Sequence, residues 1–458
     1  MFLDFLIWCN FAQKIKIKAT KKRKFYKKGE LIMNMKKVTA LGLAAIMAAT
    51  LVPVTAMADE AGSVYYLNFK PEADAAWQEL AATYTEQTGV EVKVVTAASG
   101  EYENTLTAEM GKSSAPTLFQ CGNQQSLATW GDYCLDLSDT DVYAEMTTDD
   151  FNLKSEDGAV KAIGYCYEAF GLITNKALLA EAGYEVSDIT NLETLTAVVE
   201  DITARKDELG FSAFSSAGLD GSSSWRFSGH LANMPLYNEF RDDGVTEQPA
   251  EITGAYLDNF KAIWDLYVNN ATVETSALPT ATGDMSKEEF GSGQAVFYQN
   301  GTWEYDSLVN DYSMNPEDLT MIPIYIGVEG EENSALACGT ENCWAVNCKA
   351  SEEDIQATLD FMNWVVTSEE GTTMMAEQFG PIPFNNAKES TNVFFTAANE
   401  LIAEGKYVVT WAFNYTPNVD NWRAAVVSTL QDYTCNNGSW DNVVTAFVNG
   451  WATQYANQ

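Results

Sequence analysis

The chain has 458 residues and carries 27 Lys and Arg against 64 Asp and Glu, which gives a formal net charge of −37. Such an acidic protein repels nucleic acid, anionic lipid and anionic ligands, so we expect a neutral or cationic ligand and no nucleic acid partner. With 46% hydrophobic and 12% aromatic residues the chain can bury a core, and its length exceeds one typical domain.

Residues 35–58 are typical of a secretory signal peptide. Two lysines precede an apolar run over 38–54, and Ala56-Met57-Ala58 fits a small-x-small cleavage site. We expect an exported protein, at the cell surface, in the periplasm or outside the cell, whose mature start near Asp59 has no lipid-anchor cysteine. Residues 1–34 do not fit the signal, and we interpret them as an over-called start. Removal of the first 58 residues leaves 16 basic and 62 acidic residues, a net charge of −46.

Strands and helices alternate along the start of the mature chain. The patterns predict strands over 64–69, 90–95 and 116–120, and helices over 71–88 and 102–110. This alternation predicts an α/β lobe with a mostly parallel sheet. Further along, the predicted elements are one strand over 163–174, helices over 192–208 and 255–269, extended segments over 319–326 and 338–347, and helices over 352–366, 369–379, 422–433 and 440–455.

The segment 289–303, EFGSGQAVFYQNGTW, is the most informative part of the chain. It predicts a helix end, a short apolar strand over Ala295–Tyr298, and an Asn300-Gly301 turn that delivers Trp303. An indole ring at the end of a strand lies at the edge of a sheet, at the opening of a binding site, and not in a core. We therefore expect Trp303 to face a ligand.

Five segments in order resemble the family 1 extracellular solute-binding proteins of sugar ABC transporters, which include maltose-binding proteins. They are 64–95, Pro116-Thr117-Leu118-Phe119, the YEAFGLITNK segment over 167–176, 290–303, and 361–383. The resemblance implies two doubly wound α/β lobes joined by a hinge, the type II periplasmic binding protein fold. Lobe 1 would comprise 59–165 plus about 338–385, and lobe 2 would comprise 166–337 plus about 386–458.

The resemblance also implies a function. A monomeric protein would bind a neutral mono- or oligosaccharide between its lobes, close about the hinge, and present the closed form to membrane permease subunits of an ABC transporter. A saccharide needs flat aromatic surfaces and a few fixed polar groups. The candidate binding residues are Trp303, Glu168, Gln120, Asn123, Gln124, Phe69, Lys70, Trp225, Trp411 and Trp422.

Two other classes of protein stay open: a secreted glycoside hydrolase, and a ligand-binding partner of a sensor kinase. Carboxylate pairs are too common in this chain to indicate a hydrolase. His230 is the only histidine and is interpreted as structural, and the spacing of Cys338, Cys343 and Cys348 fits no zinc or iron–sulfur site. We therefore expect no catalytic residue, no cofactor and no metal, and we expect a Cys121–Cys134 disulfide among seven mature cysteines.

Overall fold

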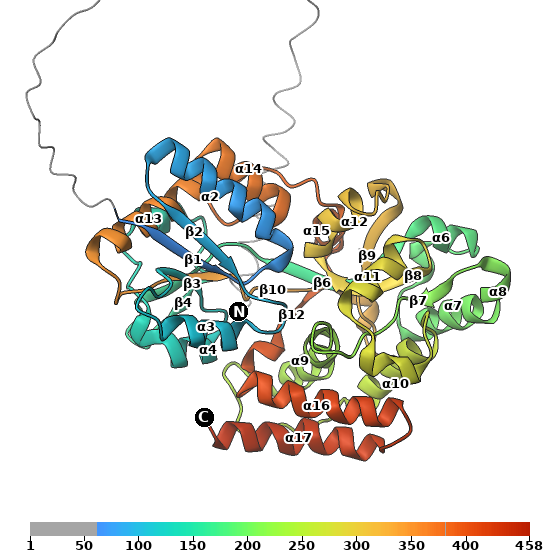
Figure 1. Cartoon of the computed structure of the whole chain (residues 1–458). Helices are drawn as coiled ribbons and strands as arrows, with labels where there is room; N and C mark the ends of the chain where they lie inside the picture. The colour runs from blue at the N-terminus through green and yellow to red at the C-terminus, as the bar shows by residue number, and fades with distance from the viewer. Residues whose placement is uncertain (1–61, 381) are drawn as a thin grey trace, which may run out of the picture. The chain divides into compact units, whose positions relative to one another are not determined.

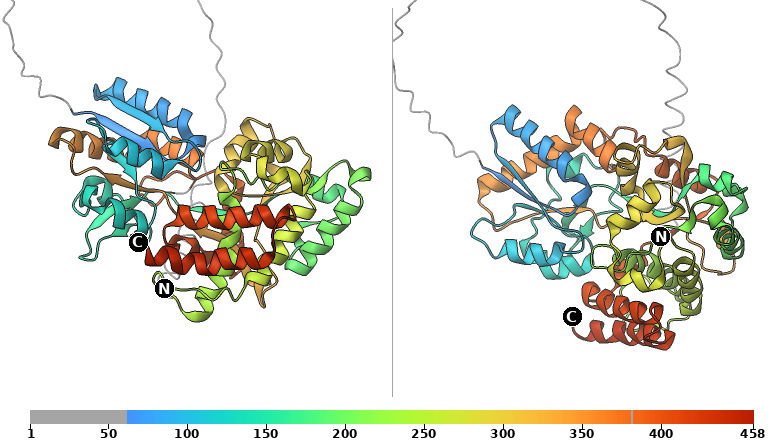
Figure 2. Two further views of the ribbon diagram at one scale, coloured as in Figure 1. Left: turned by 60° about the horizontal axis from the view of Figure 1, so that its bottom comes forward. Right: turned by 45° about the vertical axis from the view of Figure 1, so that its right-hand side comes forward.

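The computed structural model describes residues 62–380 and 382–458. The predicted signal peptide and over-called start lie outside the described residues. From Gly62 onward the chain forms two six-stranded mixed sheets, each covered by helices and each with its own hydrophobic core (Figure 1, Figure 2). The fold class predicted from the sequence, two α/β lobes, is confirmed.

The first sheet has the strand order β2-β1-β3-β11-β5-β4. Its strands are β1 (Val64–Asn68), β2 (Val92–Thr96), β3 (Leu118–Gln120), β4 (Leu153–Lys154), β5 (Val160–Gly164) and β11 (Cys343–Val346). Strands β2, β1 and β3 are parallel, whereas β11, β5 and β4 join them in antiparallel pairs. The prediction of a mostly parallel sheet is therefore wrong for the half that contains β11, because a late segment returns to this sheet.

Helices cover both faces of the first sheet. Trp77 on α2 (Asp74–Thr88) packs with Trp344 and with α13 (Glu352–Thr367) and α14 (Glu369–Gln378) on one face. On the other face lie α3 (Tyr102–Met110) and α4 (Gln124–Trp130), around Leu106 and Phe119 (Figure 1). The short α5 (Asp141–Ala144) contacts α13.

The second sheet has the order β12-β10-β6-β8-β7, with β9 also paired to β6. Its strands are β6 (Glu168–Asn175), β7 (Ser212–Phe214), β8 (Ala295–Gly301), β9 (Leu319–Ile322), β10 (Ser334–Gly339) and β12 (Tyr407–Thr410). The helices of this part are α6 (Lys176–Glu181), α7 (Leu192–Ala204), α8 (Lys206–Leu209), α9 (Ala232–Asp243), α10 (Leu257–Asn269), α11 (Gly283–Gly291), α12 (Tyr305–Asn310), α15 (Val393–Ala403), α16 (Val419–Thr434) and α17 (Trp440–Ala456).

Two predicted extended segments each divide into two strands of different sheets. The single strand expected over 163–174 is β5 of the first sheet followed by β6 of the second. The segment 338–347 likewise holds the end of β10 and the whole of β11. The one-strand prediction over 163–174 is wrong, because the residues that cross between the sheets, such as Tyr165 and Cys166, are as buried and apolar as the strands themselves.

The seven cysteines of the described residues are all free thiols. The predicted Cys121–Cys134 disulfide is therefore wrong for this structure, although both side chains are buried in the same cluster. Within residues 62–380 and 382–458, no helix combines the length and apolar character needed to cross a bilayer.

Candidate functional site

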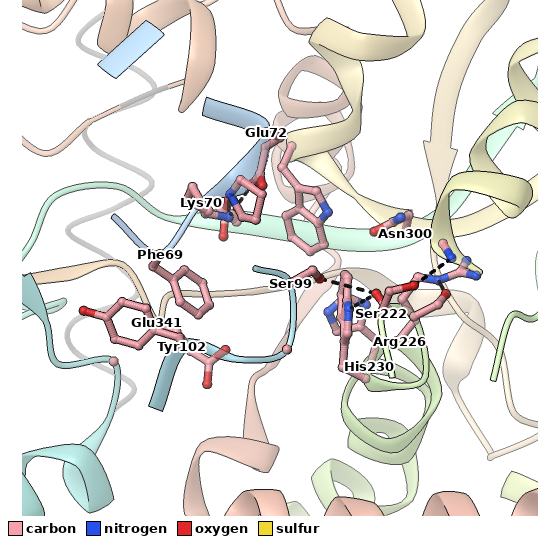
Figure 3. Close-up of a pocket in the computed structure, with 18 of the residues that line it drawn as sticks. Phe69, Lys70, Glu72, Ser99, Tyr102, Ser222, Arg226, His230, Asn300 and Glu341 are labelled. Atoms are coloured by element: carbon pink, nitrogen blue, oxygen red, sulfur yellow. Dashed lines mark hydrogen bonds and ion pairs between the residues drawn. The ribbon is translucent and has the colours of Figure 1, made fainter. Parts of the chain in front are cut away.

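Both sheets line one cavity of about 580 Å³ (Figure 3). Its walls come from residues just after β1 and β3, from the start of β6, from the end of β8 and from the first turns of α16. Small-molecule pockets are typically of this size, about 300–1,000 Å³. Eight of the ten predicted residues line the cavity, namely Phe69, Lys70, Gln120, Asn123, Glu168, Trp225, Trp303 and Trp411.

The wall from the first sheet is built at the carboxyl edge of its parallel strands, where open α/β sheets bind ligands. Phe69 follows β1 and packs edge-to-face on Tyr102, with ring centroids 5.3 Å apart. Gln120 ends β3, and its backbone N–H donates to the Tyr102 hydroxyl at 2.6 Å. Asn123 lines the same wall, but its side-chain oxygen already accepts from the Ser126 N–H at 2.9 Å and caps α4.

Trp303 reaches the cavity by a route that differs from the predicted turn. Strand β8 continues through Asn300 and Gly301, because Gly301 still pairs with Phe170 of β6. The predicted Asn-Gly turn is therefore wrong, and Trp303 lies on the 3-10 turn that follows. A Cβ on Gly301 would come within 2.2 Å of the indole ring, so only glycine lets the ring fold back over the strand end.

Aromatic rings from several elements surround Trp303. The centroid of its ring is 6.1 Å from that of Trp225 and 5.4 Å from that of His230. His230 stacks on Phe170 at 4.1 Å with an interplanar angle of 9°, and Trp411 packs on the same Phe170 at 5.6 Å. This wall therefore offers flat apolar surfaces with polar edges, the combination that suits the C–H faces of a polar ring ligand.

The sequence interpretation of His230 as purely structural is incomplete, because His230 lines the cavity. It sits in a π-helical turn over Arg226–Leu231, and its Nδ1 lies 3.1 Å from Nε2 of Gln299. Burial, followed by the positive charges of Arg423, Arg226 and Lys70, lowers the pKa of His230 well below its ordinary value. The imidazole is therefore neutral at physiological pH.

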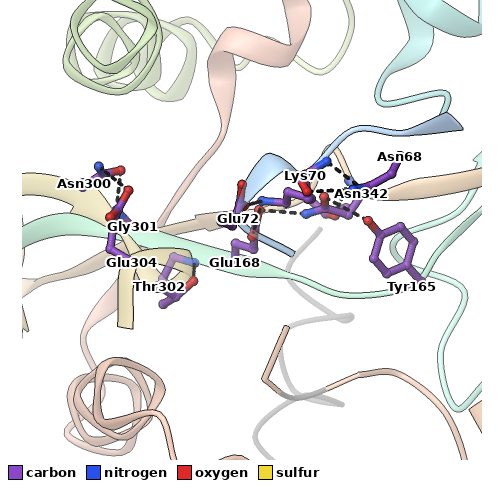
Figure 4. Close-up of polar contacts among 12 residues, drawn as sticks. Asn68, Lys70, Glu72, Tyr165, Glu168, Asn300, Gly301, Thr302, Glu304 and Asn342 are labelled. Atoms are coloured by element: carbon purple, nitrogen blue, oxygen red, sulfur yellow. Dashed lines mark hydrogen bonds and ion pairs between the residues drawn. The ribbon is translucent and has the colours of Figure 1, made fainter. Parts of the chain in front are cut away.

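A buried ion pair joins the two walls (Figure 4). Nζ of Lys70, just after β1, donates to Oε1 of Glu168 at the start of β6 over 2.6 Å, and the Asn342 amide donates to the other oxygen over 2.7 Å. Burial opposes the charge of Lys70, but Glu168 and Glu72 outweigh burial and raise the pKa of the ammonium above its ordinary value. The same ammonium lies 5.0 Å from the centroid of the Trp303 ring, within cation–π range.

Arg226 lines the cavity but acts as a support. Its guanidinium donates to the carbonyl oxygens of Gln299 and Ala217 at 2.7 and 2.6 Å and to the hydroxyls of Ser223 and Ser286 at 3.0 Å each. These bonds fix the loop that precedes Trp225 to the end of β8.

Two predicted binding residues do not reach the cavity. Trp422 on α16 is 1% exposed and packs against Phe447 and Trp451 of α17, and its indole N–H donates to the Phe447 carbonyl. The prediction for Trp422 is wrong, because the apolar face between these two helices takes up the ring. Gln124 is exposed in the first turn of α4 and does not line the cavity, so its role stays a prediction.

Other lining residues were missed, among them Glu103, Glu341, Asp420 and Arg423. The helix predicted over 422–433 in fact begins at Val419. With that start, Asp420 and Arg423 are three residues apart and lie on one face of the helix. The correct helix start would therefore have indicated that these two side chains lie together. Glu341 carries no local signal, since its place depends on where the chain crosses between the sheets.

Comparison with known proteins places the chain in a family. A model of the bacterial extracellular solute-binding proteins matches residues 79–404. RafE in complex with raffinose, a protein also solved in apo form from Streptococcus pneumoniae, superposes with a TM-score of 0.68 at 15% identity, covering 86% of this chain and 99% of that one. A Bacillus licheniformis sugar transporter in complex with stachyose gives a TM-score of 0.65 at 16% identity over 85% and 100%.

A family 1 extracellular solute-binding protein from Bifidobacterium longum subsp. infantis gives a TM-score of 0.56 at 18% identity over 86% of this chain and 100% of that one. These likenesses show the fold, and no curated protein sequence matches the chain. The family match covers most of the residues, and the fold agrees with it. The chain therefore belongs to the bacterial extracellular solute-binding proteins.

Proposed function

We propose that the chain is the substrate-binding protein of an ABC importer and that it holds a mono- or oligosaccharide in the cavity between its two lobes. The observation that carries this proposal is the aromatic wall formed by Trp303, Trp225, His230 and Trp411, which line the same cavity as Phe69 and Gln120 of the first sheet. Aromatic faces and hydrogen-bonding groups in one cavity match the alternating C–H and hydroxyl surfaces of a sugar ring.

The solved structures with this fold support the ligand class. RafE is in complex with raffinose, the Bacillus licheniformis sugar transporter is in complex with stachyose, and a further neighbour is a chitin oligosaccharide binding protein; these ligands are all built from several sugar rings. The cavity of about 580 Å³ has room for more than one ring.

Binding proceeds by closure about a hinge. Three segments cross between the sheets, over 165–167, 340–342 and 385–392. A ligand that touches both walls favours the closed arrangement of the lobes, and the closed form is recognised by membrane permease subunits. We further propose the lobe boundaries that the sequence predicts, and an exported monomer that releases its sugar chemically unchanged.

Tryptophan fluorescence and product analysis on one set of samples test the proposal. The protein is titrated with raffinose, stachyose and chitin, cello- and xylo-oligosaccharides, and the same mixtures are analysed for shorter sugars after prolonged incubation. A saturable fluorescence change without new products is expected. Hydrolysis products, or no response to any sugar, would contradict it.

Trp303→Ala tests where the response arises. We expect it to lose both affinity and most of the signal. Trp364→Ala is the matched control, since Trp364 is also half-buried but packs on Tyr84 in the first sheet's core, outside the cavity lining.

A further inference from the structure

The cavity lining carries an excess of negative charge. Seven carboxylates face it against four cationic side chains, a net charge of −3 with His230 neutral; they are Glu72, Glu103, Glu168, Asp284, Glu304, Glu341 and Asp420, against Lys70, Arg226, Lys287 and Arg423. A cavity that binds only neutral groups gains nothing from this excess, since each buried charge costs desolvation.

Ion pairs account for only part of these charges. Lys70 neutralises Glu168, and Lys287 lies 3.1 Å from Glu304. Arg226 is bonded to carbonyl and hydroxyl oxygens in the wall of the second sheet.

Three of the remaining carboxylates come from three separate elements and lie near one another. Burial raises the pKa values of Glu103 and Glu341, and the charge of Asp420 adds to both. A Cβ on Gly122, two residues after Gln120, would lie 3.2 Å from the Glu341 Cβ. Glu103 lies on α3, Glu341 lies between β10 and β11, and Asp420 lies in the first turn of α16. We call these three residues, together with Gln120, the acidic end. Arg423 is the cation beside it, and no ion pair joins Arg423 to a carboxylate of the described residues.

Among the described residues no ion pair joins a carboxylate of the acidic end to a cation. Glu103 accepts from the Trp130 indole N–H at 3.2 Å and from the Ser126 hydroxyl at 3.3 Å, and Arg423 is the cation beside Glu341. Burial raises the pKa of Glu341 above its ordinary value, Arg423 offsets part of the rise, and the carboxylates of Glu168 and Asp420 add to it. The Glu341 carboxylate accepts no hydrogen bond from any residue in 62–380 or 382–458. A cation next to this carboxylate would therefore stabilise its charged form.

Gln120 gives an independent sign that a ligand donor is missing at the same end. Its side chain is 2% exposed and lines the cavity, yet Oε1 is buried without a hydrogen-bond partner in the described structure. Gln120 of β3 pairs with Trp344 of β11. Trp344 follows Glu341 by three residues, so Gln120 lies next to the segment that holds Glu341. A buried carbonyl oxygen left without a donor costs about 1–3 kcal/mol, so a ligand that supplies a donor is favoured there.

We propose that the bound saccharide carries a protonated amino group at the end of the cavity lined by Glu103, Glu341, Asp420 and Gln120, so that the ligand is a basic amino sugar. The proposal rests on the proposed function and replaces the neutral sugar expected from the sequence. An ammonium group supplies three donors and one positive charge. The acidic end offers acceptor oxygens and unbalanced negative charge, whereas a hydroxyl would supply one donor and no charge.

Calorimetry with three trisaccharides that differ only at carbon 2 tests the proposal. They are the β-1,4 trimers of glucosamine, N-acetylglucosamine and glucose, at about pH 6.5, where the amine is largely protonated next to carboxylates. The glucosamine trimer is expected to bind about tenfold tighter than either neutral trimer. This advantage should shrink as salt is raised, because salt screens charge interactions.

Charge-removing variants locate the effect. Glu341→Gln and Asp420→Asn should each weaken binding of the glucosamine trimer about five- to tenfold, and should weaken binding of the neutral trimers by a smaller factor. Asp284→Asn is the matched control, because Asp284 is a carboxylate that lines the same cavity from α11. Unchanged thermal unfolding of each variant establishes that the fold is intact.

The outcomes separate the two proposals. If a neutral trimer binds as tightly as the amine, or if Glu341→Gln and Asp420→Asn act no more strongly than Asp284→Asn, the amino-sugar proposal is wrong while sugar binding stands. Failure of all three trimers to bind also overturns it. Spermidine is a linear polyamine without sugar rings, and its binding in place of every sugar would overturn both proposals.

Discussion

Replacement of Lys70 by methionine should destabilise the protein through the carboxylate that it leaves behind. Glu168 is 5% exposed, and its Oε1 accepts from Lys70 at 2.6 Å. Met fills a similar volume, so the packing beside Trp303 is largely kept. After the substitution Glu168 retains only the hydrogen bond from Asn342. The variant therefore isolates the cost of a buried charge without its partner.

The size of the effect follows from this burial. Breaking a buried pair by removing one partner costs about 3–5 kcal/mol of unfolding free energy. Unfolding entropy is about 2.1 cal/mol/K per residue, which gives about 0.8 kcal/mol/K for the roughly 400 residues from Gly62 to Gln458. If both lobes unfold in one transition, Tm should fall by about 4–6 °C.

Scanning calorimetry of the unliganded protein measures this shift against two further variants. Lys112→Met breaks a pair in which Lys112 is 57% exposed, and such surface pairs contribute at most about 1 kcal/mol, so Tm should fall by about 1 °C or less. Lys70→Met combined with Glu168→Gln should recover much of the loss, since the orphaned charge is gone. Equal shifts for Lys70→Met and Lys112→Met, or no recovery in the double variant, would refute the reasoning.

Three other expectations concern the aromatic wall. Trp303→Ala should weaken saccharide binding by at least about tenfold in calorimetric titration, since a stacked aromatic ring contributes about 1.5 kcal/mol, and an unchanged Kd would contradict its role. Gly301→Ala places a methyl group 2.2 Å from the Trp303 ring. This overpacking should lower the free energy of unfolding by about 1–3 kcal/mol and therefore lower Tm. An unaltered Tm and Kd would show that the ring is free to move. His230, the only histidine, should show NMR signals that do not titrate between about pH 8 and 6. Because the unfolded chain takes up that proton below about pH 6.5 and the folded chain does not, His230 also makes the protein less stable as pH falls through this value, and a normal titration would contradict the buried neutral ring.

Local patterns were sufficient where an element is fixed by its own residues. The strand–helix–strand over 64–96 follows from apolar alternation, an amphipathic helix and Gly89, which ends α2 in the left-handed region with φ of 80°. The crossing between β5 and β6 was missed because Tyr165 and Cys166 are both fully buried, and an unbroken apolar run gives no sign of a change of sheet.

The candidate site was predictable to the extent that it lies at strand ends. Phe69 and Lys70 follow β1 and Gln120 ends β3, and these strands are parallel, so their meeting at one edge is a property of the topology. Trp422 could not be assigned from the sequence. A buried indole whose N–H donates to a backbone carbonyl and an indole that stacks on a ligand cannot be told apart by the residues around them. Glu341 could not be predicted, because its position depends on where the chain crosses between the two sheets, and no local pattern marks that crossing.

In the proposed closure about a hinge, the two kinds of contact between the lobes should respond differently. Lys70 and Glu168 meet beside the crossing segments, close to any hinge axis, whereas at the rim the Ser99 hydroxyl donates to the Ser222 carbonyl at 3.3 Å (Figure 3). A rotation moves atoms in proportion to their distance from its axis, so it separates the rim contact long before it stretches the buried pair. We therefore expect the buried pair to stabilise the open and the closed arrangement of the lobes equally. The rim contact and the ligand should stabilise only the closed arrangement. For this reason Lys70→Met should lower Tm without ligand, whereas the ligand's own stabilisation depends on residues that face the cavity from both walls.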